Sequence, residues 1–205
     1  MSIICGFDPP SVKNLGYALF SINKSKKTIK LKSAGIIQLK DEYKDEQYNY
    51  DFAVKTSKLE NFLDNFYEEN KIKEIVMEKQ VLSTKTTKYA TPNFIAVQTG
   101  LMSNTIEKLS YENNLKRYRI HNRTLKKQVT GDGNCSKQDV LDKMVELLGL
   151  ELDYEAEDCT EKQYLKKYEH CFDSMALCLA QYSDCKVLSY GEFRPLNFVV
   201  EGDDV

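Results

Sequence analysis

The 205-residue sequence contains no tryptophan, two histidines and four prolines. It has no apolar run approaching the ~18 to 20 residues that span a bilayer, so we expect no transmembrane helix and no membrane partner. The N-terminal segment MSIICGFD has no basic stretch before its apolar residues, which predicts that the protein is not secreted. With 41% hydrophobic and 29% charged residues, the composition excludes wholesale disorder and favours one compact domain.

The six cysteines lack the spacing of a metal site, because none of them forms Cys-x-x-Cys. Without a secretory signal, we expect reduced thiols in the cytoplasm or another intracellular reducing compartment. Cys171, Cys178 and Cys185 recur every seven residues. This spacing predicts one side of a helix, where the three thiols would be small buried hydrophobes.

The net charge of −2 hides an uneven distribution. Residues 1–150 contain 24 basic residues (Lys and Arg) and 18 acidic residues (Asp and Glu). Residues 151–205 contain 5 basic and 13 acidic residues. A basic body with an acidic C-terminal part is compatible with a phosphate-binding surface. Charge alone does not decide the function.

Hydrophobic patterning predicts an α/β fold around a five-stranded mixed sheet. Three apolar or alternating segments with short connections, 2–8, 16–23 and 28–39, predict a three-strand antiparallel meander. Two further strands, at 72–77 and 117–121, each follow a helix, expected near 51–69 and 92–113. They should therefore join the sheet in parallel beside the first strand. This order of elements is the ribonuclease H-like arrangement.

The rest of the chain predicts three more helices, near 122–131, 137–149 and 170–184. Ser136 and Asp139 have the spacing of a capping box at the start of the second of these, and Asn122 suits the cap of the first. We expect a single domain over residues 1–186, with an acidic insertion at about 150–169. Residues 187–205 form a C-terminal extension with strand-like pieces.

Three acids stand where predicted elements end or begin. Asp8 ends the first strand, Glu78 ends the fourth, and Asp173 lies in the first turn of the last helix, after His170. The carboxyl ends of neighbouring parallel strands meet at one edge of a sheet, so these acids could converge. Convergent carboxylates bind Mg²⁺ or Mn²⁺, and two such ions can catalyse phosphodiester hydrolysis. Each acid alone is as readily a turn residue, a strand-end charge or a helix-dipole partner; the ordered set favours a site.

Basic residues surround these acids in the sequence. One group follows Glu78 and comprises Lys79, Lys85 and Lys88, and a second surrounds the fifth strand and comprises Lys116, Arg117, Arg119, Arg123, Lys126 and Lys127. Such charges can neutralise DNA phosphates. A solvated surface is an equally common interpretation of each group.

Four segments together are similar to a known family. They are IICGFDPPSVKNLGYALF with Asp8 and Gly16, IVMEKQ with Glu78, RTLKKQVTGDGNCSKQDVLDKMV with Lys126 and Lys137, and HCFDSMALCLA with His170 and Asp173. In this order they resemble the RuvC-like Holliday junction resolvases, outside the insertion and the tail after about 186. The sequence departs from the family pattern at Pro10, where a glycine is usual, and at Val81 and Leu82, where some members carry an aromatic wedge.

The resemblance implies a metal-dependent endonuclease that resolves four-way DNA junctions by paired nicks. Asp8, Glu78 and Asp173 would hold two Mg²⁺ ions, with Mn²⁺ as a substitute, and His170 would act as a ligand or proton carrier. Lys137 would stabilise charge on the transferred phosphate. The DNA contacts would come from Lys79, Lys85, Lys88, Arg119, Arg123, Lys126 and Lys127.

Paired cuts require two active sites, so the resemblance also implies a homodimer. The helix near 92–113, with Ile95, Leu101 and Met102, is a candidate dimer seam, and burial in the monomer core is an equal alternative. Two other functions stay open: another ribonuclease H-fold nuclease that acts on RNA or other branched DNA, and a non-catalytic junction-binding module.

Overall fold

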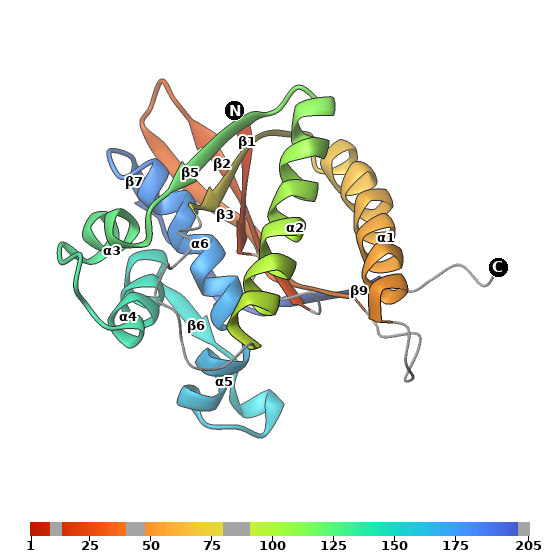
Figure 1. The fold of residues 1–205 in the computed structure, drawn as a ribbon. Helices are drawn as coiled ribbons and strands as arrows, with labels where there is room; N and C mark the ends of the chain where they lie inside the picture. Colours follow the sequence, from red (N-terminus) through yellow and green to blue (C-terminus); the bar gives the residue numbers. More distant parts are fainter. Residues whose placement is uncertain (9–13, 40–47, 80–90, 201–205) are drawn as a thin grey trace.

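The computed structural model describes residues 1–8, 14–39, 48–79 and 91–200, and Figure 1 shows its ribbon. A mixed sheet forms its centre. The meander consists of β1 (Ser2–Asp8), β2 (Asn14–Asn23) and β3 (Thr28–Leu39), and β2 pairs antiparallel with both β1 and β3. β4 (Ile72–Glu78) pairs in parallel with β1, and β5 (Lys116–Ile120) pairs in parallel with β4. The predicted five-stranded arrangement with β1 at its centre is confirmed.

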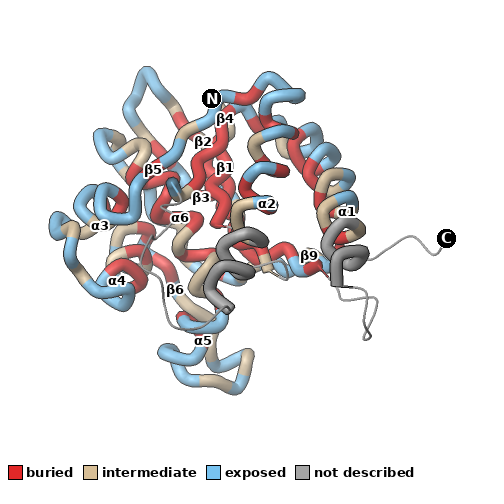
Figure 2. The backbone as a smooth tube through the Cα atoms, viewed as in Figure 1, coloured by how far each residue is buried: buried red, intermediate tan, exposed pale blue. Residues whose placement is uncertain are grey.

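Helices cover both faces of this sheet (Figure 1). One face carries α1 (Tyr48–Glu69) and α2 (Thr91–Glu112), and the other carries α3 (Asn122–Thr130), α4 (Lys137–Leu148) and α6 (Glu169–Gln181). Successive side chains of a strand point to opposite faces. Cys5 and Phe7 of β1 accordingly pack with α1 and α2, and Ile4 packs with α3, α4 and α6. Figure 2 shows the central strands buried between these two layers.

The C-terminal extension adds two strands to the sheet. β7 (Lys186–Leu188) and β9 (Leu196–Val200) both pair in parallel with β3, so the sheet has seven strands within the part of the chain that the structure describes. The five strands expected from the sequence are thus the centre of a wider sheet.

The acidic insertion is part of the folded core. It contains β6 (Leu150–Leu152), the short 3₁₀ helix η1 (Glu155–Glu157) and α5 (Glu161–Lys167). β6 pairs in parallel with β8 (Gly191–Phe193) from the extension. Tyr164, Leu165 and Tyr168 are buried in the same core as α6. The insertion and the extension therefore stabilise each other and the α6 layer.

Several local predictions are confirmed and others are wrong. The capping box of Ser136 and Asp139 opens α4 as expected. His121, and not Asn122, occupies the N-cap position of α3. α6 begins at Glu169, which places Asp173 in its second turn, and it ends before Cys185. The helical stripe of cysteines is therefore limited to Cys171 and Cys178, which are buried; all six cysteines are free thiols.

The suggested dimer seam on α2 is divided between core and surface. Met102 is buried in the monomer core, whereas Leu101 is 42% exposed. The side chain of Ile95 lies outside the described residues. Core burial, the alternative given above, therefore holds for Met102.

Among the described residues, no helix is both long and apolar enough to cross a membrane.

Candidate active site

Asp8 and Glu78 end neighbouring parallel strands. Phe7 pairs with Met77 in the β1–β4 register, so the two acids come next at the same edge of the sheet. Side-chain alternation places both on the face covered by α6, since Ile4 and Val76 point to that face. As expected, the carboxyl ends of β1 and β4 lie side by side at one edge of the sheet.

Two glycines allow α6 to lie directly on β1 and β2. A Cβ atom on Gly6 would come within 2.2 Å of the carbonyl oxygen of Ser174, and one on Gly16 within 2.2 Å of the carbonyl oxygen of His170. Any side chain at either position would push the helix away from the sheet. This close approach brings the first turns of α6, with His170 and Asp173, over the end of β1.

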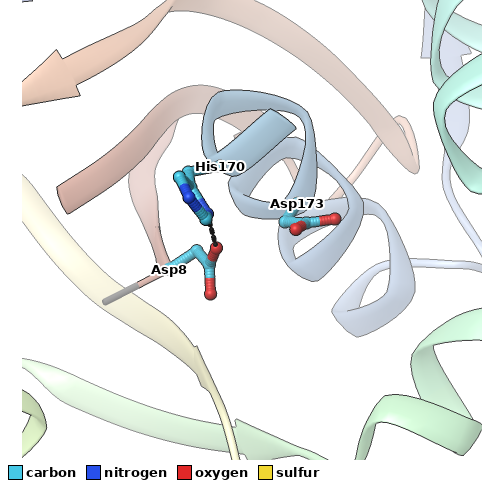
Figure 3. A group of neighbouring side chains, drawn as sticks. All are labelled: Asp8, His170 and Asp173. Atoms are coloured by element: carbon cyan, nitrogen blue, oxygen red, sulfur yellow. Dashed lines mark hydrogen bonds and ion pairs between the residues drawn. The ribbon is translucent and has the colours of Figure 1, made fainter. Parts of the chain in front are cut away.

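Asp8, His170 and Asp173 converge at this point. Nδ1 of His170 lies 2.9 Å from Oδ2 of Asp8, and one ligand atom from each of the three residues lies within 4.8 Å of the others. Figure 3 shows the imidazole directed at the Asp8 carboxylate, with Asp173 beside them on α6. Asp8 is 9% exposed, so its charge is largely removed from water.

Lys137 completes the centre from the first turn of α4. Its Nζ lies 2.9 Å from Oδ2 of Asp173 and 3.4 Å from Oε2 of Glu169. Oε1 of Glu169 in turn lies 3.6 Å from Nε2 of His170. Because the capping box fixes the start of α4, the lysine is held beside Asp173.

The electrostatics of the site show that like charges are crowded there. Burial, and then the charge of Asp8, raise the pKa of Asp173 to about 6, although Lys137 opposes this shift. Burial also raises the pKa of Glu78; a hydrogen bond from Asn122 opposes the rise and Asp8 adds to it. Burial would lower the pKa of Lys137, but the nearby carboxylates, Asp173 first, outweigh it and raise that pKa. A cation placed among these carboxylates would relieve the repulsion.

The donor set fits a hard divalent cation. Asp8 and Asp173 offer carboxylate oxygens and His170 offers an imidazole nitrogen within one small space. Glu78 does not belong to this close group, yet its charge interacts with those of Asp8 and Lys137. Three of the four predicted ligands are therefore brought together, with the fourth at the edge.

A cleft of about 810 Å³ opens beside Glu78 at the start of α3. The predicted DNA-contacting residues Lys79, Arg123 and Lys127 line it, together with His121 and Asn122. Lys126 is positioned differently: its Nζ donates to the carbonyl oxygen of Cys135 at 2.6 Å and ties α3 to the glycine turn before α4.

The structure does not bring Arg119 to the acidic centre. Tyr118 and Ile120 of β5 face the α6 side, so Arg119 points to the opposite face, where it pairs with Glu107 of α2. Lys85 and Lys88 lie outside the described residues, as do Pro10, Val81 and Leu82.

Sequence reasoning missed Glu169 and Asn122. Glu169 precedes Asp173 by four residues, the spacing that places two side chains on one side of a helix. Asn122 follows the end of β5 and so lies near the end of β4, where it bonds Glu78. Both positions could be predicted from these spacings once the bounds of α6, β4 and β5 were known.

Comparison with known proteins identifies the fold. No protein-family model and no curated protein sequence matches the chain. Among solved structures, Thermus thermophilus RuvC in complex with Holliday junction substrate superposes with a TM-score of 0.62 at 15% identity, over 88% of this chain and 92% of that one. The chain has the fold of a RuvC-like Holliday junction resolvase.

A second solved structure agrees. The yeast mitochondrial Holliday junction resolvase Ydc2 superposes with a TM-score of 0.58 at 16% identity, over 89% of this chain and 78% of that one. The RuvC-like fold predicted from four short motifs is therefore confirmed, although pairwise identity is low.

Proposed function

We propose that this protein is a divalent-metal-dependent endonuclease that resolves four-way DNA junctions by paired nicks. The observation that carries the proposal is the convergence of Asp8, His170 and Asp173 within 4.8 Å, at the strand ends of a RuvC-like sheet. Lys137 beside them, and a basic cleft next to Glu78, support a phosphodiester as the substrate.

Asp8, His170 and Asp173 would hold Mg²⁺, or Mn²⁺ in its place, with Glu78 at the edge of the same site. Two bound ions would supply positive charge against both the attacking and the leaving oxygen of the phosphodiester. Around them, Asp8 fixes the orientation of the imidazole through its hydrogen bond to Nδ1. The imidazole is thereby directed as a ligand or as a carrier for the proton of the departing oxygen.

Lys137 would act on the phosphate itself. Its side chain is half exposed, so the ammonium can meet a substrate from its position beside Asp173. A fixed positive charge stabilises the negative charge that grows on the non-bridging oxygens in the transition state.

The cleft lined by Lys79, Arg123 and Lys127 would hold the phosphates that flank the scissile bond. Lys126 would contribute mainly by keeping α3 and the glycine turn together. Lys85, Lys88 and Arg119 remain proposed DNA contacts. Arg119 would have to leave Glu107 or contact DNA from the far face of the sheet.

Paired nicks on opposite strands require two active sites, so we propose a homodimer. The exposed side of α2 around Leu101 is available for the seam.

The free thiols fit the cytoplasm or another intracellular reducing compartment.

The test is a substrate panel with Mg²⁺ and with EDTA. A synthetic four-way junction, a three-way junction, linear duplex and hairpin RNA are incubated with the protein at equal concentration. We expect symmetric nicks in the four-way junction, little cutting of the linear duplex or RNA, and none in EDTA. Preferential RNA cleavage would favour another ribonuclease H-fold nuclease, and tight binding without any cleavage would favour a junction-binding module.

A further inference from the structure

Glu169 shares one lysine with the candidate metal ligand Asp173. Nζ of Lys137 lies 3.4 Å from Oε2 of Glu169 and 2.9 Å from Oδ2 of Asp173. The two acids are four residues apart on α6, so both project from one side of that helix toward α4. A single ammonium group therefore faces two carboxylates.

This arrangement is built from rigid elements. The capping box of Ser136 and Asp139 fixes the first turn of α4, where Lys137 lies. The packing of α6 against Gly6 and Gly16 fixes the first turns of α6. Carboxylates at this spacing repel each other, and the shared lysine offsets the repulsion.

A divalent cation would compete with Lys137. A cation held by Asp8, His170 and Asp173 would interact with the Asp173 carboxylate, which is also the group that the Lys137 ammonium contacts. The two positive charges also repel each other at such short range. If Asp173 were its only partner, Lys137 would be held less firmly beside the site whenever the cation bound.

We propose that Glu169 is a positioning residue that retains Lys137 beside the acidic centre when a cation occupies Asp173. Glu169 gives the ammonium a second carboxylate less than 4 Å away, so the lysine can shift its pairing without leaving the site. The contact of Glu169 with Nε2 of His170, at 3.6 Å, keeps the carboxylate at the centre. The inference rests on the proposed function only in treating the site as one that binds a divalent cation.

The first test is Mn²⁺ binding, measured by electron paramagnetic resonance on wild type, E169Q, K137A and the double variant. We expect E169Q to weaken Mn²⁺ binding ~3- to 10-fold when Lys137 is present, because the lysine then competes for Asp173. In the K137A background the same change should alter the affinity less than ~2-fold. An equal weakening in both backgrounds would overturn the proposal, since it would mean that Glu169 contributes only its negative charge.

Two further variants control this measurement. E161Q removes one exposed acid from the first turn of α5 and should leave Mn²⁺ affinity unchanged. E169D keeps the charge on a shorter side chain and should recover part of the affinity lost in E169Q. Failure of E169D to bind more tightly than E169Q, with both variants melting like wild type, would count against a role for the charge in holding Lys137.

The second test is single-turnover cleavage of a four-way junction at saturating Mn²⁺. E169Q should lower the rate ~10-fold, with junction affinity in Ca²⁺ changed less than ~2-fold, and should add no further loss to K137A. Additive losses would overturn the proposal. If wild type cuts no branched DNA, the proposed nuclease function fails, while the Mn²⁺ measurements still decide the role of Glu169.

Discussion

Asp8 and His170 stand 162 residues apart in the sequence, and a hydrogen bond of 2.9 Å joins Oδ2 of the first to Nδ1 of the second. This contact depends on the packing of a helix against two strands. The carbonyl oxygen of His170 lies so close to Gly16 that no side chain fits between them. The geometry of the acidic centre is therefore set by the β2–α6 contact as much as by the acids themselves.

Gly16→Ala should separate α6 from β2. The new methyl group would meet backbone atoms of His170, which cannot rotate away as a side chain could. We expect a loss of about 1–3 kcal/mol in the free energy of unfolding and a fall of at least ~10-fold in junction cleavage. Denaturant unfolding and single-turnover kinetics measure the two effects, and wild-type values in both would contradict this account of the helix position.

Asp173 should make the metal-free protein less stable at neutral pH than at pH 4 to 5. Its pKa is raised to about 6, so between its ordinary value and pH 6 the folded state binds the proton more tightly than the unfolded state. The contribution of this group to stability therefore falls as the pH rises through that window and stays low above it. Asp173→Asn removes the penalty and should be more stable than wild type by up to about 3 kcal/mol at pH 8.

That difference should vanish near pH 4, where wild-type Asp173 is protonated. Melting temperatures of both proteins in EDTA between pH 4 and pH 8 provide the measurement. A variant less stable than wild type at pH 8 would show that the ion pair with Lys137 outweighs burial and the repulsion from Asp8.

Lys137→Ala should affect chemistry more than binding. Other basic residues proposed to contact DNA, including Lys79 and Arg123, would still line the cleft. The ammonium gains most when charge grows on the phosphate. We expect the single-turnover rate to fall ~10²-fold, about 2.7 kcal/mol on the barrier, while the junction Kd changes less than ~5-fold. A collapse of binding with a near-normal rate at saturating protein would instead make Lys137 a phosphate anchor.

The acidic insertion should be needed for folding, but its exposed charges should not be needed for DNA binding. Replacing residues 151–169 by a Gly/Ser linker removes Tyr164, Leu165 and Tyr168 from the core, and we expect loss of cooperative unfolding. Leu165→Ala alone should cost about 2–4 kcal/mol.

Neutralising the exposed acids Glu151, Glu155 and Asp158 tests the surface of the insertion separately. The triple variant should melt like wild type and bind the junction equally well, or more tightly at low salt if these charges repel the DNA. A marked loss of affinity would place this surface in the DNA-binding interface.

The sequence contained enough information for the central sheet and for Asp8, His170 and Asp173, which the structure brings together. Long periodic segments predicted the strand order. Asp8 and Glu78 were recognisable because each ends a strand, and Asp173 because it lies near the start of a helix. β7, of three residues, carries little periodicity, and the pairing of β7 and β9 with β3 depends on tertiary contacts that no local pattern encodes. The same holds for the buried tyrosines of the insertion.

The direction of Arg119, toward Glu107, was not foreseen from the sequence. Proximity in sequence to other basic residues suggested a common surface, but side-chain alternation in a strand separates neighbours onto opposite faces. Tyr118 and Ile120, as the apolar residues of β5, already indicated which face was buried against α6. Glu169 was overlooked because the start of α6 was placed one residue late.

The acidic centre should be essential for cleavage and dispensable for folding. Asp8→Asn, Glu78→Gln and Asp173→Asn each remove a charge with little change in volume. We expect each to reduce cleavage by ~10³-fold or more, with melting temperatures unchanged or raised because repulsion is relieved. Circular dichroism and junction binding in Ca²⁺ serve as controls that each variant is folded and recognises DNA.

The most direct measurement compares wild type and Asp8→Asn on a synthetic four-way junction in Mg²⁺. Asp8 belongs to the group of candidate ligands that lie closest together and is hydrogen-bonded to His170, so we expect its charge to matter most. The account predicts paired, metal-dependent nicks by the wild type and no detectable nicks by Asp8→Asn at equal junction occupancy. Cleavage by Asp8→Asn at the wild-type rate, or the absence of Mg²⁺-dependent nicks by wild type, would contradict it.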